Sequence, residues 1–417
     1  MKIGIIGGGA AGLMAAATIC ENASAATEIF LIERNLELGK KVLISGGGRC
    51  NVTTGIRDMR ALFEKYPRGA KFLSSALYQF TPEDVYAWFE SNGVPLKIED
   101  DLRVFPVSDN GHDVVYALEK KFTEPARVKI LLGHTATSIR RTEKKFVIDF
   151  KTQPKIIVDK LIITTGGQAY RHTGSTGDGY TFAESLGHTV TPCAASLSSF
   201  ISRDAWVKSL AGVSFDRVSV STDRSTPIAR AARITGPLMF THHGITGPAI
   251  FAFSAHIAYE PVTPATPLNI FLNFFPDKNL EEVTHMVHDA CALNGKRTIV
   301  NVIATFIPKS VAEIICTLAE ISAEKRAGDM NKKEILRVSE TLRALCVCAI
   351  GRGAGDEFVT AGGVALNEVN PSTMESCVTP GLFFAGEILD VDGFTGGFNL
   401  QASWATGRLA GKAALSS

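Results

Sequence analysis

The chain has 417 residues, of which 45% are hydrophobic and 20% charged, and its formal net charge is +1. This length exceeds what one hydrophobic core usually supports, so we expect two or three domains. The near-neutral charge gives no global signal for binding to nucleic acid or a membrane surface, and no apolar stretch is long enough to predict a transmembrane helix. The eight cysteines lack the spacing of a disulfide framework, which favours a cytoplasmic protein.

The N-terminal segment predicts a βαβ unit, with a buried strand at 2–7, a helix at about 11–22 and a second strand at 28–33. Shorter strands are expected at 128–132 and 146–150. A further apolar strand, KLIITTGG, ends at Gly167. This alternation is typical of an α/β nucleotide-binding domain.

A glycine turn of the form G-x-G-x-x-G joins the first strand to the helix. Gly7 permits the tight turn, Gly9 lets a pyrophosphate approach the backbone, and Gly12 allows close packing of helix on strand. The helix begins at about Ala11, directly after Ala10, and its free N–H groups attract phosphate. The turn therefore predicts dinucleotide binding.

Glu33 ends the second strand, where a carboxylate can accept hydrogen bonds from ribose hydroxyls and disfavours a 2′-phosphate. FAD or NAD therefore fits this site better than NADP. A second glycine cluster, at 386–387 and 396–399, opens a C-terminal helix whose N-terminus could face a flavin ring. Dinucleotide-binding pieces at both ends of the chain favour FAD.

The stretch GKKVLISGGGRCNVTT places three glycines beside a cation, a thiol and an amide. The glycines let backbone N–H groups approach the cofactor, while Lys41 and Arg49 offer positive charge to pyrophosphate or flavin. A redox disulfide would need a second thiol, but Gly55 stands five residues after Cys50. Cys50 is more typical of a packed residue than of a nucleophile.

The character of the chain changes after residue 191. Alternating segments and many prolines predict a β-rich insert, and three apolar stripes with helical period follow it. Each of these helices is expected to open with a capping box, at Asn279, Ser310 and Asn331. The expected division is 1–191 for the first part of an FAD-binding domain, 192–276 for the β-rich insert, 277–345 for the helical insert and 346–417 for the second part of the FAD-binding domain.

Several motifs resemble the BaiN/YhiN-like family of FAD flavoproteins, in the same order along nearly the whole chain. They are GGGAAG with Glu33 and Arg34, GKKVLISGGGRCNVT, DLRVFPVS, TTGGQAYRHTGSTGDGYTFAESLGH, MFTHHGITGPA, VTAGGVAL, TMES and PGLFFAGEILDVDGFTGGFNLQASWATGRLAG. The resemblance implies a discontinuous FAD-binding Rossmann-type domain with an inserted β-barrel-like and helical subdomain. Two positions depart from the family pattern: Thr54 stands for Asn and Arg171 for Pro.

The resemblance also implies FAD contacts from Glu33, Lys41, Asn51, Glu387, Asn399 and Leu400, with an adenine-side backbone contact from Ala136. Together with the glycine motifs, the expected cofactor-binding residues are Gly7, Gly9, Ala10, Ala11, Gly12, Glu33, Arg34, Lys41, Gly46, Gly47, Arg49, Cys50, Asn51, Ala136, Thr165, Gly166, Gly386, Glu387, Gly397, Phe398, Asn399 and Leu400. No metal site is predicted.

The resemblance implies reduction of an activated, enone-like C=C bond by hydride transfer from a flavin, with NADH or NADPH as the transient electron donor. Such chemistry needs a proton donor, for which Tyr170, His242 and Cys50 are the candidates. The resemblance leaves two alternatives open, formation of dihydrouridine in ribosomal RNA and an oxygen-using amine oxidase. A third alternative is a non-enzymatic binding module stabilised by FAD.

A small-molecule substrate is favoured over RNA. Basic residues cluster at 140–145 and, in the insert, at Arg224, Arg230 and Arg233. Such clusters are usually solvated faces, and a near-neutral chain argues mildly against a nucleic-acid partner.

Overall fold

The computed structural model describes residues 1–23, 27–123, 127–223, 232–353 and 358–416. The chain forms two compact units: unit 1 comprises Met1–Ala195 and Phe358–Ser417, and unit 2 comprises Ser196–Glu357. Unit 1 is therefore assembled from both ends of the chain, with unit 2 inserted between them.

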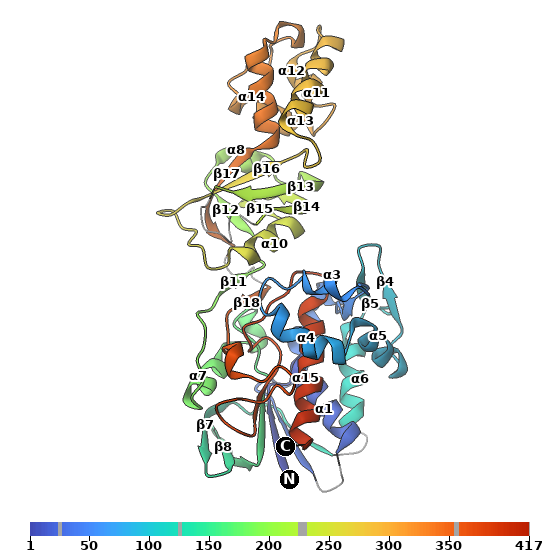
Figure 1. Ribbon diagram of the computed structural model, residues 1–417, viewed down its shortest axis with the longest axis vertical. Coiled ribbons are helices and arrows are strands. Elements are labelled where there is room, and N and C mark those ends of the chain that lie inside the picture. Colours follow the sequence, from blue (N-terminus) through green and yellow to red (C-terminus); the bar gives the residue numbers. More distant parts are fainter. Residues whose placement is uncertain (24–26, 124–126, 224–231, 354–357, 417) are drawn as a thin grey trace. The chain divides into compact units, whose positions relative to one another are not determined.

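Unit 1 contains both ends of the chain (Figure 1) and is built on a parallel sheet with the strand order β19-β10-β1-β2-β6. Its strands are β1 (Lys2–Ile6), β2 (Glu28–Ile32), β6 (Val128–Leu131), β10 (Lys160–Ile163) and β19 (Leu382–Phe384). The central strands are short apolar runs, as parallel strands covered on both faces usually are. Helices α1 (Ala10–Asn22), α6 (Gly111–Thr123) and α15 (Phe398–Ser416) belong to the same unit.

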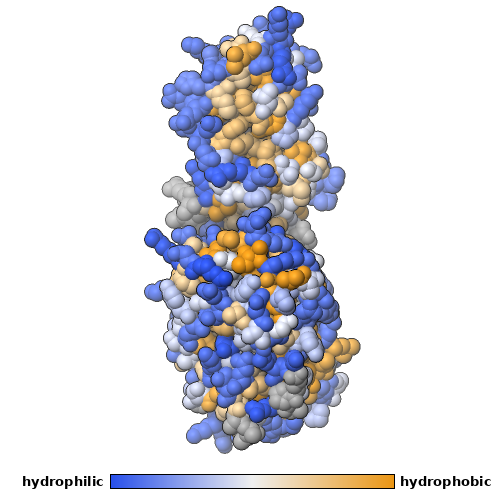
Figure 2. Space-filling model, turned by 90° about the vertical axis from the view of Figure 1, so that its right-hand side faces the viewer, coloured by the Kyte–Doolittle hydropathy of each residue, from blue (hydrophilic) through white to orange (hydrophobic). Residues whose placement is uncertain are grey.

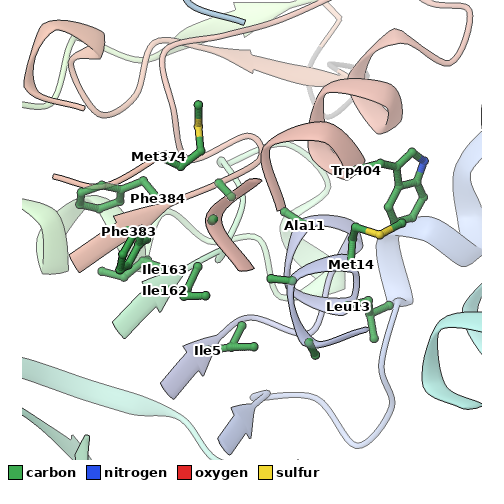
Figure 3. Packing of buried hydrophobic residues seen from close by; sticks show 14 of the residues in the cluster. Ile5, Ala11, Leu13, Met14, Ile162, Ile163, Met374, Phe383, Phe384 and Trp404 are labelled. Atoms are coloured by element: carbon green, nitrogen blue, oxygen red, sulfur yellow. The ribbon is translucent and has the colours of Figure 1, made fainter. Parts of the chain in front are cut away.

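The core of unit 1 lies between this sheet and helices α1 and α15. Figure 3 shows Leu13 and Met14 of α1 beside Trp404 of α15, with the strand residues Ile5 and Ile163 nearby. All five side chains are at most 1% exposed. Trp404 also donates its indole N–H to the carbonyl of Val52 at 2.9 Å, so its single polar group is satisfied inside the core.

Smaller elements surround this frame in unit 1. The helices are α2 (Lys40–Ile44), α3 (Met59–Phe63), α4 (Ala70–Gln79), α5 (Pro82–Ser91) and α7 (Asp178–Ser185). The strands are β3 (Thr53–Thr54), β4 (Leu96–Ile98), β5 (Arg103–Pro106), β7 (Ala136–Thr142), β8 (Lys145–Phe150), β9 (Ile156–Val158), β11 (Ala194–Ser196) and β18 (Val359–Ala361).

Unit 2 combines a closed barrel with a group of helices. The barrel order is β12-β15-β14-β13-β16-β17, from strands β12 (Phe200–Ser202), β13 (Ser214–Thr222), β14 (Ile234–Phe240), β15 (Gly244–Thr246), β16 (Leu268–Asn273) and β17 (Leu345–Arg352). The helices are α8 (Ala205–Ser209), α10 (Pro248–His256), α11 (Leu280–Leu293), α12 (Ile299–Ile303), α13 (Lys309–Leu318) and α14 (Lys332–Arg343). Barrel and helices share one hydrophobic core.

The helices α11 to α14 interrupt the barrel, because they stand between β16 and β17 in the chain. Residue 346, where the return to the FAD-binding domain was expected, lies inside β17. That strand pairs with β16 and β12 and so completes the barrel. In the structure the chain returns to unit 1 at Phe358.

Two of the three expected capping boxes are confirmed. The side chain of Asn279 accepts from Glu282 N–H at the start of α11, and Asn331 does the same with Glu334 at α14. The prediction for Ser310 is wrong: α13 begins at Lys309 with Pro308 at its N-cap and has no side-chain cap. The proline ring fixes φ at about −65°, a value that the residue before a helix can adopt, so the helix starts two residues earlier than expected.

Hydrophilic side chains cover much of the face shown in Figure 2. Within the described residues, no helix combines the length and apolar character of a membrane span.

Candidate cofactor site

The turn after β1 has the shape that a phosphate cradle requires. Gly7 has φ 108°, and a Cβ there would lie 2.5 Å from the carbonyl oxygen of Thr164. A Cβ at Gly12 would lie 1.9 Å from the carbonyl oxygen of Gly7, so helix and turn touch through backbone atoms. At Gly9, by contrast, an added Cβ would meet nothing within 4 Å. The glycine positions thus close the turn and leave open space at the helix end.

Helix α1 begins at Ala10 with Gly9 as its N-cap, and no side chain caps it or places a negative charge in its first turn. Its first N–H groups therefore offer an uncompensated positive end to an anion. Ala11 is buried and lies against Gly386, where a Cβ would come within 2.9 Å of the Ala11 side chain. The N-terminal turn and the C-terminal glycine cluster are therefore neighbours.

Helices α1 and α15 pack together through backbone atoms. A Cβ at Gly407 would lie 2.3 Å from the carbonyl oxygen of Ala11, and one at Gly411 would lie 2.8 Å from that of Ala15. The contact moves from Ala11 to Ala15 on α1 as it moves from Gly407 to Gly411 on α15, so the two helices are parallel. Both N-termini therefore point toward the carboxyl edge of the sheet. Helix α15 extends about 12 Å beyond α1 in this direction, at about 1.5 Å per residue.

Glu33 is buried where the chain leaves β2, and it is held in place as an acceptor. One oxygen accepts from Gly8 N–H at 2.7 Å, and the other accepts from the backbone and side-chain nitrogens of Asn35, both at 2.8 Å. A carboxylate has about four acceptor positions, so ribose hydroxyls can still be bound. Ala136 begins β7 close by, since His134 N–H donates to the carbonyl of Glu33 at 2.9 Å.

Arg34 ties the loop TGSTGDGY to the end of β2. Its guanidinium donates to the Thr176 hydroxyl at 2.7 Å and forms an ion pair with Asp178. Asp178 is the first residue of α7, and Gly177, in the left-handed region, is the N-cap. The carboxylate of Asp178 is turned to Arg34 and does not cap the helix.

The residues after β10 border the same turn. A Cβ at Gly166, which has φ 75°, would lie 2.7 Å from the hydroxyl of Ser175. Among the described residues, the buried hydroxyl of Thr165 has no hydrogen-bond partner. A buried orphan hydroxyl costs free energy unless a ligand or water pairs with it.

Lys41, Glu387 and Tyr170 come together from distant parts of the sequence. The Nζ of Lys41 lies 2.6 Å from Oε2 of Glu387 and 5.8 Å from the centroid of the Tyr170 ring. Tyr170 itself has φ 57° and ψ 51°, a left-handed conformation that is uncommon for an aromatic residue. Such strain is often found at functional sites.

The glycine stretch after α2 forms an open backbone loop. Gly46, Gly47 and Gly48 all have left-handed φ values, and added Cβ atoms at Gly47 and Gly48 would meet nothing within 4 Å. Cys50, also left-handed, is fully buried, and burial raises the pKa of its thiol to about 12. The structure thus places Cys50 as a packing residue with no exposed thiol.

Arg49 does not offer a free charge. Its guanidinium pairs with Glu99 at 2.7 Å and with Asp109 at 3.5 Å, and it lies 3.8 Å above the Phe105 ring. These partners come from the segment around β4 and β5. The pairing differs from the expected contact with pyrophosphate, because two carboxylates already neutralise the guanidinium.

The C-terminal cluster joins the glycine stretch at the start of α15. In the amide orientation that satisfies its neighbours, Asn51 accepts from Gly397 N–H at 2.9 Å and donates to the carbonyl of Thr53 at 3.1 Å. Asn399 accepts from Gly393 N–H at 2.8 Å, and Phe398 is buried beside Tyr66. Leu400, in the first turn of α15, is half-buried.

His242 belongs to unit 2, where it is exposed in the turn between β14 and β15. Of the two candidate acids that belong to unit 1, Tyr170 is half-buried and Cys50 is fully buried.

Sequence reasoning missed the residues that hold the expected ones in place, namely Asn35, Thr176, Glu99 and Thr406. Asn35 could have been found, since a polar residue two positions after the strand-end acid can fold back onto it. The other partners lie far away in sequence.

The arrangement fits a dinucleotide of the FAD type. The open Gly9 helix end suits a pyrophosphate, Glu33 suits a ribose, and the start of α15 with the loop at 46–48 provides backbone groups at the same edge of the sheet.

Several known proteins are similar to this chain in sequence or in fold. The 3-dehydro-bile acid delta(4,6)-reductase of Clostridium scindens is 32% identical over 422 residues, which cover 99% of this chain and 98% of that protein. A ribosomal RNA dihydrouridine synthase of Escherichia coli is 30% identical over 406 residues, covering 96% and 95%. The FrdA chain of Escherichia coli quinol fumarate reductase has the same fold, with a TM-score of 0.51, 15% identity, and coverage of 100% of this chain and 70% of that one.

The model of the HI0933-like protein Rossmann domain matches residues 1–413. The chain therefore belongs to the HI0933-like Rossmann family, the BaiN/YhiN-like flavoproteins that its motifs resemble.

Proposed function

We propose that the chain is an FAD-dependent oxidoreductase that reduces an activated C=C bond in a small molecule. The observation that carries the proposal is the pair of parallel helices, α1 and α15, whose N-termini reach the edge of the sheet where Glu33 and the open glycine loop also lie. The 32% identity with a protein named as a bile acid delta(4,6)-reductase supports the reaction class.

FAD, when bound, supplies hydride chemistry, and the chain supplies orientation and a proton. Hydride addition to the β-carbon of an enone leaves a carbanion-like α-carbon that must take up a proton. We assign this proton to the hydroxyl of Tyr170. The ammonium group of Lys41 beside its ring would stabilise the tyrosinate that forms, and Glu387 fixes the position of Lys41.

Ribosomal RNA is a second candidate substrate, since a relative of 30% identity is named as a ribosomal RNA dihydrouridine synthase. A uracil ring presents the same kind of conjugated C=C bond. Of the basic residues noted in the sequence, Arg140 pairs with Asp149 at 3.1 Å, while Arg224 and Arg230 lie outside the described residues.

Anaerobic stopped-flow with the FAD-loaded protein tests the proposal. Rapid loss of flavin absorbance near 450 nm with NADH or NADPH is expected, followed by its return on addition of a conjugated 3-oxo steroid. If the flavin absorbance returns with uracil-containing RNA but with no enone, RNA would replace the small molecule as the proposed substrate. Return with oxygen alone would favour an oxidase, and no bleaching by either nucleotide would contradict the proposed electron donor.

A further inference from the structure

Unit 2 contains a cavity of about 420 Å³ on the outer wall of the barrel, beside the C-terminal end of α14. Ser219 and Ser221 of β13 and Phe271 and Asn273 of β16 line it. The register pairs Ser221 with Phe271 and Ser219 with Asn273, while the intervening residues point into the barrel core. The four side chains therefore form one continuous patch on the outside of two neighbouring strands.

Two guanidinium groups border this patch. Arg233 stands just before β14 and is exposed, and Arg343 is the last residue of α14. Among the described residues, the buried Nε of Arg343 has no hydrogen-bond partner. Because this nitrogen is buried, a ligand in the cavity cannot reach it, and what the cavity offers an anion is the positive charge of the two guanidinium groups that line it.

We propose that this cavity binds the phosphate monoester of a small hydroxylated molecule, the chemistry that nucleoside monophosphates and sugar phosphates share. The planar donor forks of Arg233 and Arg343 match phosphate oxygens. The serine hydroxyls and the Asn273 amide add donors at the floor. Glu340, one helical turn before Arg343, is the acidic group among the described lining residues, and it can accept from ligand hydroxyls.

The size and charge of the cavity both favour a small ligand over a nucleic-acid chain. Its volume lies within the range of small-molecule sites, about 300 to 1,000 Å³. Two guanidiniums and one carboxylate give a net charge of +1 at the described lining, whereas a nucleic-acid surface neutralises many phosphates in a row. The cavity lies wholly in unit 2, and the cofactor site lies in unit 1.

The test is calorimetric titration of the full chain saturated with FAD, so that AMP does not enter the cofactor site. The probes are AMP, glucose 6-phosphate, inorganic phosphate and adenosine. We expect at least one of the two monoesters to bind with a Kd below about 1 mM, and adenosine not to bind. AMP binding alone would identify a nucleotide, and glucose 6-phosphate binding alone a sugar phosphate.

Arg233→Gln and Arg343→Gln should each weaken monoester binding about tenfold. Arg217→Gln is the matched control, because Arg217 lies on the same strand β13, is exposed and pairs with Asp277 at 2.7 Å outside the cavity. Since Arg233 is exposed, its replacement leaves the core intact even where the Arg343 variant fails to fold.

Three results would overturn the proposal: no heat with either monoester at about 10 mM, equal affinity in all three variants, or binding of an RNA fragment that depends on Arg233 while neither monoester binds. Because the readout is heat and not flavin bleaching, a failure of the phosphate-binding proposal would leave the proposed reductase function untouched.

Discussion

Glu33 connects the parallel sheet to the glycine turn, since its carboxylate accepts from Gly8 N–H and from Asn35. We expect Glu33→Ala to weaken FAD binding tenfold or more, because losing a charged hydrogen-bond acceptor costs about 1.5–3 kcal/mol. The measurement is the ratio of flavin to protein absorbance after extended dialysis. Glu37→Ala, an exposed carboxylate four residues later, is the control. Full FAD occupancy in the Glu33 variant would remove this residue from the site.

Tyr170 carries the proposed proton. Tyr170→Phe keeps the ring beside Lys41 but removes the hydroxyl, so kcat on an enone should fall about a hundredfold while bleaching by nucleotide stays unchanged. Tyr116→Phe, at a residue 65% exposed, should have no effect on either rate. Unchanged turnover in the Tyr170 variant would pass the role to His242 or to water.

His188 links the pH dependence of stability to a buried contact. It is 4% exposed, its Nε2 lies 2.7 Å from the Ser376 hydroxyl, and its Nδ1 lies 3.3 Å from Glu368. Burial lowers the pKa of His188 in spite of the opposing effect of Glu368. The unfolded chain then takes up a proton near its ordinary pKa of about 6.5, which the folded chain does not.

The free energy of unfolding should therefore decrease as pH falls below about 6.5, and it should be unaffected by His188 above that value. Thermal unfolding between pH 8 and 5 measures this, with His188→Gln as the comparison. The loss of Tm on acidification should be smaller in the variant. An equal loss in both proteins would assign the effect to other groups.

The roles of single residues could be predicted from sequence where the chemistry is local. The functions of Gly7, Gly9 and Gly12 follow from their order in a strand–turn–helix, and the structure gives each the expected geometry. The environment of Arg49 could not be predicted, because its partner Glu99 is 50 residues away and the pairing depends on tertiary structure. The burial of Cys50 has the same origin.

At the scale of elements, the contact between α1 and α15 brings the two ends of the chain together. Gly407→Ala would place a methyl group 2.3 Å from the Ala11 carbonyl, so the helices must separate. We expect a loss of about 1–3 kcal/mol in the free energy of unfolding, measured by urea denaturation, together with weaker FAD binding. Gly236→Ala, whose nearest atoms lie 3.7 Å away, is the control and should change little.

Element boundaries show the same division between local and distant signals. The capping boxes at Asn279 and Asn331 are encoded within four residues and are confirmed. The expected boundary at residue 346 separates β17 from the barrel that it completes, because its partners β16 and β12 lie far back in the sequence. Nothing local in ALCVCAIGR distinguishes a barrel strand from a strand of the parallel sheet.

At the scale of the whole molecule, the two units have separate hydrophobic cores. We expect calorimetry to resolve two unfolding transitions. FAD should raise the midpoint temperature of the unit 1 transition alone, since a ligand stabilises the part that binds it. Binding of the proposed phosphate monoester should raise the midpoint temperature of the unit 2 transition. A single transition that shifts as a whole with FAD would show that the units unfold together.

The nesting of unit 2 inside unit 1, and of α11–α14 inside the barrel, sets an order for folding during synthesis. The barrel lacks its last strand until Arg352 has left the ribosome, but from then on unit 2 has all its elements. Unit 1 must wait longer, because β19 and α15 are made last. The Rossmann sheet, with four of its five strands made, therefore emerges first yet is completed second, and during that interval the apolar surface of α1 is available to chaperones.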